Sequence, residues 1–254
     1  MNRKIKRVVG KDQNGQIMEV REYDKRGNLT YEFLHDVFDG STLEIKREYD
    51  KHNNITRDEK IDELGCHTVD TYQYKYDKNN NPIEIIKNGG ECVIKQVFDE
   101  NGRLLMVRMN DMSTSYFVYD QNGRLVRKIL KDTDYIYRYD KNGNVIYNAE
   151  IMITGNQYNI ISEVYSDYDS KNNLIHQIGE GEEEEFYSYN ENNQLIYYKF
   201  RLLNRDIRAD EINEDYPDYE MWRKYNSKGE LSEIKVLDSN GVEKIITFEY
   251  EYYK

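Results

Sequence analysis

YDQNGRL, residues 119–125, is one of nine copies of a seven-residue motif that recurs along the whole chain. Each copy has an aromatic residue, then Asp or Asn, two polar residues, Gly or Asn, a variable residue and, except at Pro82, an apolar residue. The copies begin at Tyr23, Tyr49, Tyr76, Phe98, Tyr119, Tyr139, Tyr168, Tyr189 and Tyr225. Two degenerate copies flank them, DQNGQI at 12–17 and LDSNGVE at 237–243. This periodicity predicts one supersecondary unit repeated many times.

The second and fifth positions of the motif predict a tight turn. A short acceptor side chain at the second position can bind backbone N–H groups two residues later, which starts a turn. Gly or Asn at the fifth position favours the left-handed backbone conformation. Together they describe a type I turn closed by a G1 bulge, a common hairpin connection. The residues given this structural role are Asp24, Gly27, Asp99, Gly102, Asp120, Gly123, Asp140, Gly143 and Gly229.

The segments between the motifs alternate aromatic and polar residues. TYQYKYD places Tyr72, Tyr74 and Tyr76 on one face, and FEYEYYK repeats the pattern with Phe248 and Tyr250. Such alternation is typical of half-buried strands, and no stretch has clear helical periodicity. We therefore predict an all-β fold in which antiparallel β-hairpin repeats form a twisted single sheet of about twenty short strands.

This predicted sheet is a β-meander, solenoid-like, that can spiral, and it occupies one domain over residues 1–254. Its irregular end repeats are expected to act as caps. Mean hydropathy is −0.96, yet the chain has 25 Tyr, 7 Phe and 1 Trp. Disordered chains are poor in aromatic residues, so these numbers favour a thin fold in which half-exposed Tyr replaces buried aliphatic side chains.

The motif Aromatic–Asp–x–x–Gly–Asn/Arg–Leu, as in YDQNGRL at 119–125, resembles the YD repeats of bacterial Rhs and wall-associated proteins. Teneurins and toxin-complex cocoon proteins carry similar repeats. The resemblance implies a ribbon of β-hairpins that spirals, in some members into a hollow shell around a toxin domain. This chain is too short to close such a shell alone, and with only Pro82 and Pro217 it lacks the Pro-rich self-cleavage segment of the shell proteins. The resemblance therefore implies a short stand-alone YD-repeat protein without autoproteolysis.

Catalytic and metal-binding patterns are missing from the sequence, and we expect no enzyme activity, no cofactor and no metal. The four histidines are scattered, and Cys66 and His67 are adjacent, which points them to opposite faces of a strand. No G-x-S-x-G, P-loop or H-E-x-x-H motif occurs. The turn DKNNNP at 77–82 offers oxygen ligands, but Pro82 stands where a calcium loop needs Gly.

Two segments interrupt the repeat and are our candidate binding sites. The first, between Tyr189 and Tyr225, stretches the spacing to 36 residues. Insertions in a repeat often carry function, although this one could equally be a longer hairpin. The second is acidic and could dock a basic partner or simply protect a hairpin from aggregation. The binding residues predicted in the two segments are Arg205, Arg208, Tyr216, Tyr219, Trp222, Glu182, Glu183, Glu184 and Glu185.

The net charge of −12 disfavours a nucleic-acid partner, whose phosphates need cations, and suits a basic protein. No apolar run is long enough for a membrane span, and no signal peptide is visible, so we expect a cytoplasmic protein. We predict a non-catalytic bacterial protein-binding scaffold, an immunity or accessory protein whose partner is a basic toxin domain of an Rhs-type system. The alternatives are a carbohydrate-binding or cell-surface module that uses Trp222, and a fragment of a larger toxin shell. The sequence does not fix the oligomeric state.

Overall fold

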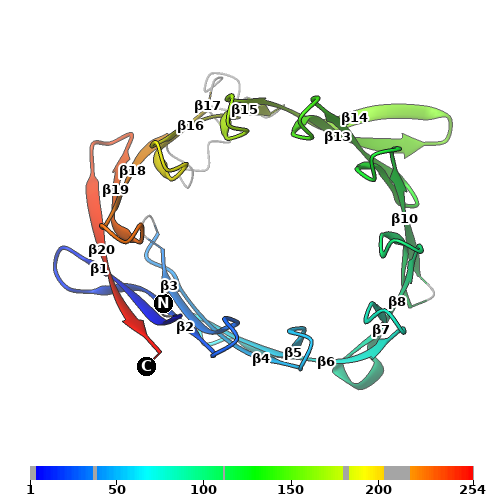
Figure 1. The fold of residues 1–254 in the computed structure, drawn as a ribbon, viewed down its shortest axis with the longest axis horizontal. Coiled ribbons are helices and arrows are strands. Elements are labelled where there is room, and N and C mark those ends of the chain that lie inside the picture. The colour runs from blue at the N-terminus through cyan, green and yellow to red at the C-terminus, as the bar shows by residue number, and fades with distance from the viewer. Residues whose placement is uncertain (1–3, 37–38, 111, 180–182, 203–217, 254) are drawn as a thin grey trace. The chain divides into compact units, whose positions relative to one another are not determined.

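The computed structural model describes residues 4–36, 39–110, 112–179, 183–202 and 218–253 (Figure 1). These residues form two compact units. Unit 1 holds the described residues of Met1–Tyr72, Leu195–Lys199 and Glu211–Lys254, and unit 2 those of Gln73–Gln194 and Phe200–Asp210. Strands β6 and β17 contribute residues to both units. Organisation as a single domain over 1–254 stays a prediction.

The strands of unit 1 come from both ends of the chain. They are β1 (Ile5–Asp12), β2 (Ile17–Tyr23), β3 (Leu29–His35), β4 (Thr42–Tyr49), β5 (Ile55–Asp62), most of β6 (His67–Tyr76), the start of β17 (Leu195–Leu202), β18 (Tyr219–Tyr225), β19 (Leu231–Asp238) and β20 (Glu243–Tyr252). Pairing is antiparallel in the order β18–β19–β20–β1–β2–β3–β4–β5–β6.

Unit 2 is a meander whose strands pair in chain order. Its strands are β7 (Pro82–Lys87), β8 (Cys92–Phe98), β9 (Leu104–Met109), β10 (Ser113–Tyr119), β11 (Leu125–Ile129), β12 (Thr133–Tyr139), β13 (Val145–Thr154), β14 (Gln157–Tyr168), β15 (Leu174–Gly179) and β16 (Glu183–Tyr189). A 3-10 turn at Asn88–Gly90 is the only helical segment among the described residues. The prediction of an all-β, antiparallel fold is confirmed.

The arrangement of the two terminal strands corrects the predicted open or spiralling sheet with capping end repeats. Strand β1 lies between β2 and β20, with Val9 opposite Val20 on one side and Glu249 on the other. The first and last strands therefore bond to each other, and neither is a free edge. This pairing satisfies the backbone groups of β1 and β20 that a cap would otherwise have to protect.

The apolar core is thin, as the composition predicts. In unit 1 the buried apolar residues are Val8, Val9, Met18, Val20, Ile45 and Val236, and in unit 2 only Ala149 reaches the same burial among the described residues. Polar side chains fill much of the remaining interior of unit 1. Arg21 binds Glu19 at 2.7 Å and Glu32 at 3.1 Å, and Arg47 binds Asp58 at 3.2 Å. These half-buried carboxylates and guanidinium groups are tolerated because they are paired.

The motif turns share one hydrogen-bond pattern. In the turn at Asp140–Asn144, the N–H of Gly143 donates to the carbonyl oxygen of Asp140 at 3.2 Å, and Asp140 Oδ1 accepts from the N–H groups of Asn142 and Asn144. Gly143 has φ +92°, in the region that favours glycine. Where Asn replaces Gly, as at Asn193, φ is also positive. This geometry fits a type I turn followed by a G1 bulge.

Both degenerate copies form the same turn, at Asp12 and at Asp238. A further turn of this kind occupies Asp62–Cys66, where Gly65 has φ +76°. The sequence analysis missed this turn because an Ile precedes Asp62 in place of the aromatic residue. The turn itself therefore depends on the Asx and Gly positions and not on the aromatic one.

The aromatic residue of the motif connects one hairpin to the preceding one. The Tyr139 hydroxyl donates to the carbonyl oxygen of Leu125 at 2.6 Å, and Leu125 ends the preceding motif. The same bond, at 2.7 to 3.1 Å, joins the pairs Tyr49–Leu29, Tyr119–Leu104, Tyr168–Val145, Tyr225–Leu195 and Tyr250–Leu231. Burial raises the pKa of Tyr250 to about 12, which keeps its hydroxyl a donor. The motif prefers Tyr over Phe because this carbonyl needs a partner.

The sixth residue of the motif adds a second lateral connection. Arg124 bonds to Asp120 within its own turn, and its guanidinium carbon lies 4.8 Å from the ring centroid of the next anchor, Tyr139. Arg124 Nη1 also donates to the Asp140 carbonyl in the next turn at 3.3 Å, and Asn144, the sixth residue of the following motif, donates to Asn172 at 3.0 Å. We call these side-to-side bonds between successive turns the turn ladder.

Candidate binding surfaces

Four of the predicted binding residues, Arg205, Arg208, Tyr216 and Glu182, lie outside the described residues. The other five fall on two strands in different units, Tyr219 and Trp222 on β18 and Glu183, Glu184 and Glu185 on β16.

Trp222 is half-buried among side chains of unit 1. Its ring centroid lies 5.6 Å from that of Tyr197 on β17, and Lys235 Nζ lies 5.7 Å from the indole centroid. Tyr219 packs against Tyr198 at 5.5 Å. Aromatic and cation–π contacts of this kind stabilise the sheet. A sugar platform needs an open ring face, and these contacts leave Trp222 less surface for that role.

The three described glutamates of the acidic segment have different surroundings. Glu183 is exposed, whereas the Glu185 carboxylate accepts a hydrogen bond from the Tyr187 hydroxyl. Glu184 is buried and binds both His176 and Arg201. Of these three residues, only Glu183 has a carboxylate that is exposed for a basic partner.

His176 stands at the centre of a polar cluster in unit 2. Its Nδ1 lies 3.2 Å from Asp167 Oδ2, and its Nε2 lies 2.9 Å from Glu184 Oε1. Arg201 binds the second oxygen of Glu184 and lies 5.3 Å from the ring centroid of Phe186. These four charged side chains come from β14, β15, β16 and β17, so they connect consecutive strands.

The charges of this cluster reinforce one another. Burial alone would lower the pKa of His176, but its hydrogen bonds to Asp167 and Glu184 raise it above the ordinary value. Burial would raise the pKa of Glu184, but the bonds from His176 and Arg201 lower it. The hydrogen bonds therefore favour the charged forms of His176 and Glu184, as in a structural ion-pair network.

The sequence analysis missed the cluster, although a signal for it exists in the repeat. In each described hairpin, the residue before the anchor aromatic faces the residue eight positions after the anchor, as Asp167 faces His176 and Arg138 faces Tyr147. This register follows from the bulge beside each motif turn. Adding eight to each anchor position would have paired Asp167 with His176.

A pocket of about 470 Å³ lies in unit 1, where the β1–β2 and β19–β20 turns approach the β3–β4 connection. Its lining includes the acidic residues Asp12, Asp39 and Glu243, together with His35. The His35 Nδ1 atom lies 3.1 Å from Nε2, the side-chain amide nitrogen of Gln16. Within the described ranges, no group of three or more His, Cys, Asp and Glu side chains is placed to hold a metal ion. The pocket is acidic in character, like the chain as a whole.

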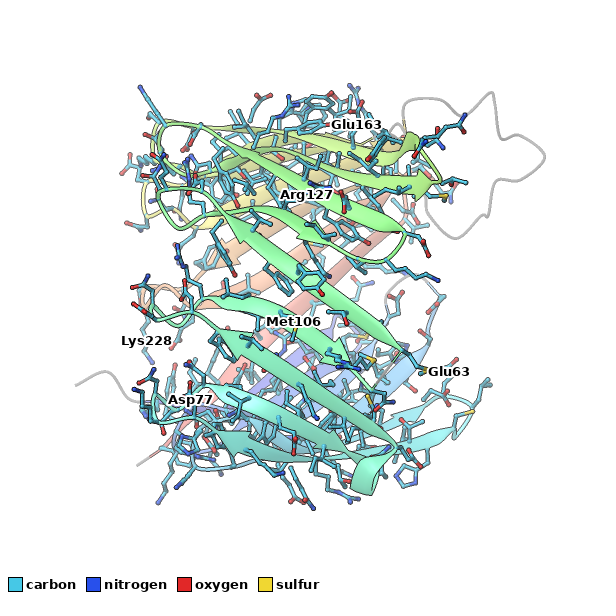
Figure 2. The ribbon with its side chains drawn as sticks, turned by 90° about the vertical axis from the view of Figure 1, so that its right-hand side faces the viewer. Glu63, Asp77, Met106, Arg127, Glu163 and Lys228 are labelled. Carbon is cyan, nitrogen blue, oxygen red and sulfur yellow. The ribbon has the colours of Figure 1, made fainter. Side chains whose placement is uncertain are left out.

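The hairpin of β13 and β14 exposes several apolar residues in unit 2 (Figure 1). Tyr158 is 69% exposed and Ile160 is 52% exposed, and the first six residues of β14 are all exposed. Figure 2 labels Glu163, on β14 of this hairpin, and Arg127, on β11 of the same unit. Contiguous exposed apolar residues are a feature of many interaction sites, so this hairpin is a further candidate surface.

No model of a known protein family matches the sequence, and neither does any curated protein. Among solved structures, the crystal structure of TcdB2-TccC3-TEV matches 94% of this chain with a TM-score of 0.50 and 12% identity. This chain spans 14% of the length of that protein. At this level of identity the match concerns the fold alone.

Two further structures score lower. The Photorhabdus luminescens Tc holotoxin pore matches 87% of this chain with a TM-score of 0.40 and 13% identity, over 14% of that chain. A porin-like protein from Bacteroides uniformis matches 97% of this chain with a TM-score of 0.36 and 10% identity, over 98% of that chain. Of the three, only the TcdB2-TccC3-TEV match is close enough to support a comparison of folds. Among the described residues, no helix is long and apolar enough to cross a membrane.

Proposed function

We propose that this chain is a YD-repeat protein that serves as a non-catalytic, protein-binding scaffold in a bacterial toxin system. The observation that carries the proposal is the fold match to TcdB2-TccC3-TEV over 94% of the chain. The repeated turn supports it independently, because the motif that resembles YD repeats also builds a series of described turns with one hydrogen-bond pattern, as at Asp24, Asp120 and Asp140.

The partner that best suits this scaffold is a basic toxin domain, which the chain neutralises as an immunity protein or accompanies as an accessory protein in the cytoplasm. The net charge of −12 steers a basic protein toward the surface and accelerates association. The acidic pocket of unit 1 and the exposed Glu183 are local sites for such attraction. Catalysis has no part in the proposal.

A second candidate function is that of a segment of a longer toxin shell. The observation that favours it is the coverage of the fold match, because the chain corresponds to 14% of the matched protein. In that case the sheet would contact other hairpins of the same shell and not a separate toxin.

The test is to purify the chain and titrate it with the basic domains encoded beside its gene. We expect one of them to form a complex by calorimetry, with an affinity that falls as salt is raised, because screening weakens the attraction. Glu183→Gln should slow association, whereas Lys131→Gln, which removes an exposed positive charge, should not. Failure of every neighbouring basic domain to bind would remove the proposal, and binding only to adjacent repeat segments would favour the shell alternative.

A further inference from the structure

The hairpin of β13 and β14 is longer than the neighbouring hairpins of unit 2. Strand β14 has 12 residues and β13 has 10, and Thr154 pairs with Gln157 across a Gly155–Asn156 turn. In Figure 1 this pair of strands extends well past the adjacent strands of unit 2. Gly155 has φ +62°, which suits a two-residue hairpin turn.

The two outer edges of this hairpin differ in their backbone partners. On the β13 side, Met152 pairs with Thr133, and the Ile153 N–H donates to the Asp132 carbonyl at 2.9 Å. On the β14 side, the described pairing with β15 begins only at Val164, opposite Gly179. Among the described residues, therefore, no strand pairs with the outer edge of Gln157–Ser162.

An unpaired edge of an antiparallel sheet presents an N–H and a carbonyl at every second residue. Natural proteins usually protect such edges with lysine, proline, a bulge or a covering loop. The segment QYNIIS at 157–162 contains no charged residue and no proline. A bulge is its single protective feature, since the pairing with β13 shifts between Glu150 and Ile151, opposite Ile161. Before that bulge, Gln157–Ile160 pair with β13 without a register shift, and no described strand pairs with their other side.

The side chains of this edge are apolar as well as exposed. Ile153 pairs with Tyr158 and Ile151 with Ile160, so these four residues share one face of the hairpin. Tyr158 and Ile160 are 69% and 52% exposed. A strand added to this edge would gain backbone hydrogen bonds and, from its alternate residues, apolar contacts.

We propose that Gln157–Ser162 is a docking edge that binds an extended segment of a partner protein as an added strand. In the partner protein, this docked segment alternates basic with apolar residues. This inference rests on the proposed protein-binding function and assigns it a surface that the sequence analysis did not name.

Charge decides between the possible occupants. Glu150 pairs with Ser162, and Glu163 is the residue that follows this segment, so carboxylates lie at the inner end of the edge. A second copy of the chain carries the same net charge of −12, and a large net charge of one sign opposes self-association. Opposite charges on neighbouring strands are favourable, so the carboxylates at the inner end of this edge suit a basic strand.

The test uses a short synthetic peptide that alternates lysine with valine as the probe. Hydrogen–deuterium exchange of the intact protein should show slower exchange at Tyr158–Ile161 when this peptide is added. A peptide with proline at its central position should protect less, because proline lacks the N–H needed for the ladder. A glutamate–valine peptide should bind more weakly than the lysine–valine peptide.

Variants of the protein provide the matched control. Tyr158→Lys combined with Ile160→Lys should weaken peptide binding about tenfold, because it places like charges on the edge. Met152→Lys, at an exposed position of the strand whose edge is already paired, should change binding less than about twofold. Near-native urea midpoints for both variants would show that each is folded.

Three results would overturn the inference. The first is unchanged exchange at 157–162 with every peptide, and the second is equal binding of the glutamate and lysine peptides. The third is protection of this segment that grows with protein concentration alone, which would assign the edge to a second copy. The titration with basic toxin domains can succeed or fail independently of these results, so the docking edge and the proposed function are tested separately.

Discussion

Strand β13 has two ends that differ in almost every respect. At its start, the turn of Asp140–Asn144 is held by side-chain and backbone bonds and joined to the neighbouring turns through the Tyr139 hydroxyl and the Asn144 amide. At its far end, the Gly155–Asn156 turn lies beyond Met152, the last residue of β13 that pairs with β12. The residues that follow the turn are exposed. Among the described residues, β13 therefore joins a cross-linked turn at one end to an exposed turn without neighbouring strands at the other.

This contrast separates the two uses of the sequence in this protein. The repeated motif builds the turn ladder and connects each hairpin to the one before it. Where the repeat spacing lengthens, to 29 residues between Tyr139 and Tyr168, the extra residues form the exposed hairpin. Regularity supports the fold, and its interruption creates the exposed hairpin that we propose as a docking edge.

Low pH should have the largest effect on stability, and it acts on the motif turns through their Asp carboxylates. Burial alone would raise the pKa of Asp24, but hydrogen bonds from Asn28, Arg26 and Gly27 lower it to about 2. Hydrogen bonds within the turn also lower the pKa of the corresponding residues Asp77, Asp99, Asp120, Asp140 and Asp169.

A carboxylate with a lowered folded-state pKa stabilises the fold above its unfolded pKa, and this contribution is lost as the pH falls through the folded value. Stability measured by urea unfolding should thus decline between pH 4 and pH 2. Asp24→Asn, which copies the residue used at Asn190 and Asn226, should make that decline smaller. A stability that is constant over this range would show that the turn carboxylates contribute nothing.

Gly143→Val tests the backbone of the turn. Gly143 has φ +92°, and a β-carbon there would meet no atom within 4 Å, so the cost arises from the backbone conformation. We expect a loss of about 2 kcal/mol in the free energy of unfolding. Gly143→Asn is the control and should lose less than half as much, since Asn takes this position at Asn53 and Asn193. Equal losses for Val and Asn would contradict a left-handed turn.

Tyr139→Phe tests the bond between successive hairpins. It removes the hydroxyl that donates to the Leu125 carbonyl and should cost about 1 kcal/mol, as for other single hydrogen bonds. Tyr137→Phe, on the same strand and the same face, is the control and should have a smaller effect. If the two variants unfold at the same urea concentration, the hydroxyl bond does not connect the hairpins energetically.

The smallest effect is expected at the free end of the hairpin. Tyr158 is 69% exposed, so Tyr158→Ser should change the free energy of unfolding by less than about 0.5 kcal/mol. The same substitution should still weaken binding of the lysine–valine peptide. A large loss of stability would mean that the Tyr158 ring packs in the fold and that this end is not free.

The sequence predicts the local features of the fold and few of the distant ones. Turn positions such as Asp140 and Gly143 are predictable because an Asx–Gly pair acts on its own backbone within five residues. The pairing of β1 with β20 is not predictable, since it joins residues more than 200 positions apart and no local pattern encodes it. The cluster at His176 falls between these cases, because its register follows from the repeat while the identity of its residues does not.

The candidate binding residues illustrate the same limit. Glu183, Glu184 and Glu185 are consecutive and equally acidic in sequence, yet Glu184 is buried between His176 and Arg201 while Glu183 is exposed. Strand alternation predicts that neighbours differ, but which one is buried depends on the charges of adjacent strands. The edge of β14 gave no sequence signal, because an uncharged strand becomes an edge only through the lengths of its neighbours.

The tyrosine hydroxyl bond has a consequence for how such a chain can grow. In six described cases a motif ends with a backbone carbonyl that accepts a hydrogen bond from a tyrosine of a later strand, as Leu125 does from Tyr139. A duplicated repeat therefore brings both a carbonyl for its successor and a hydroxyl for its predecessor. Duplication or deletion of such a repeat can lengthen or shorten the protein one hairpin at a time. No new junction has to evolve, because the junction is already encoded in the unit that is copied or lost.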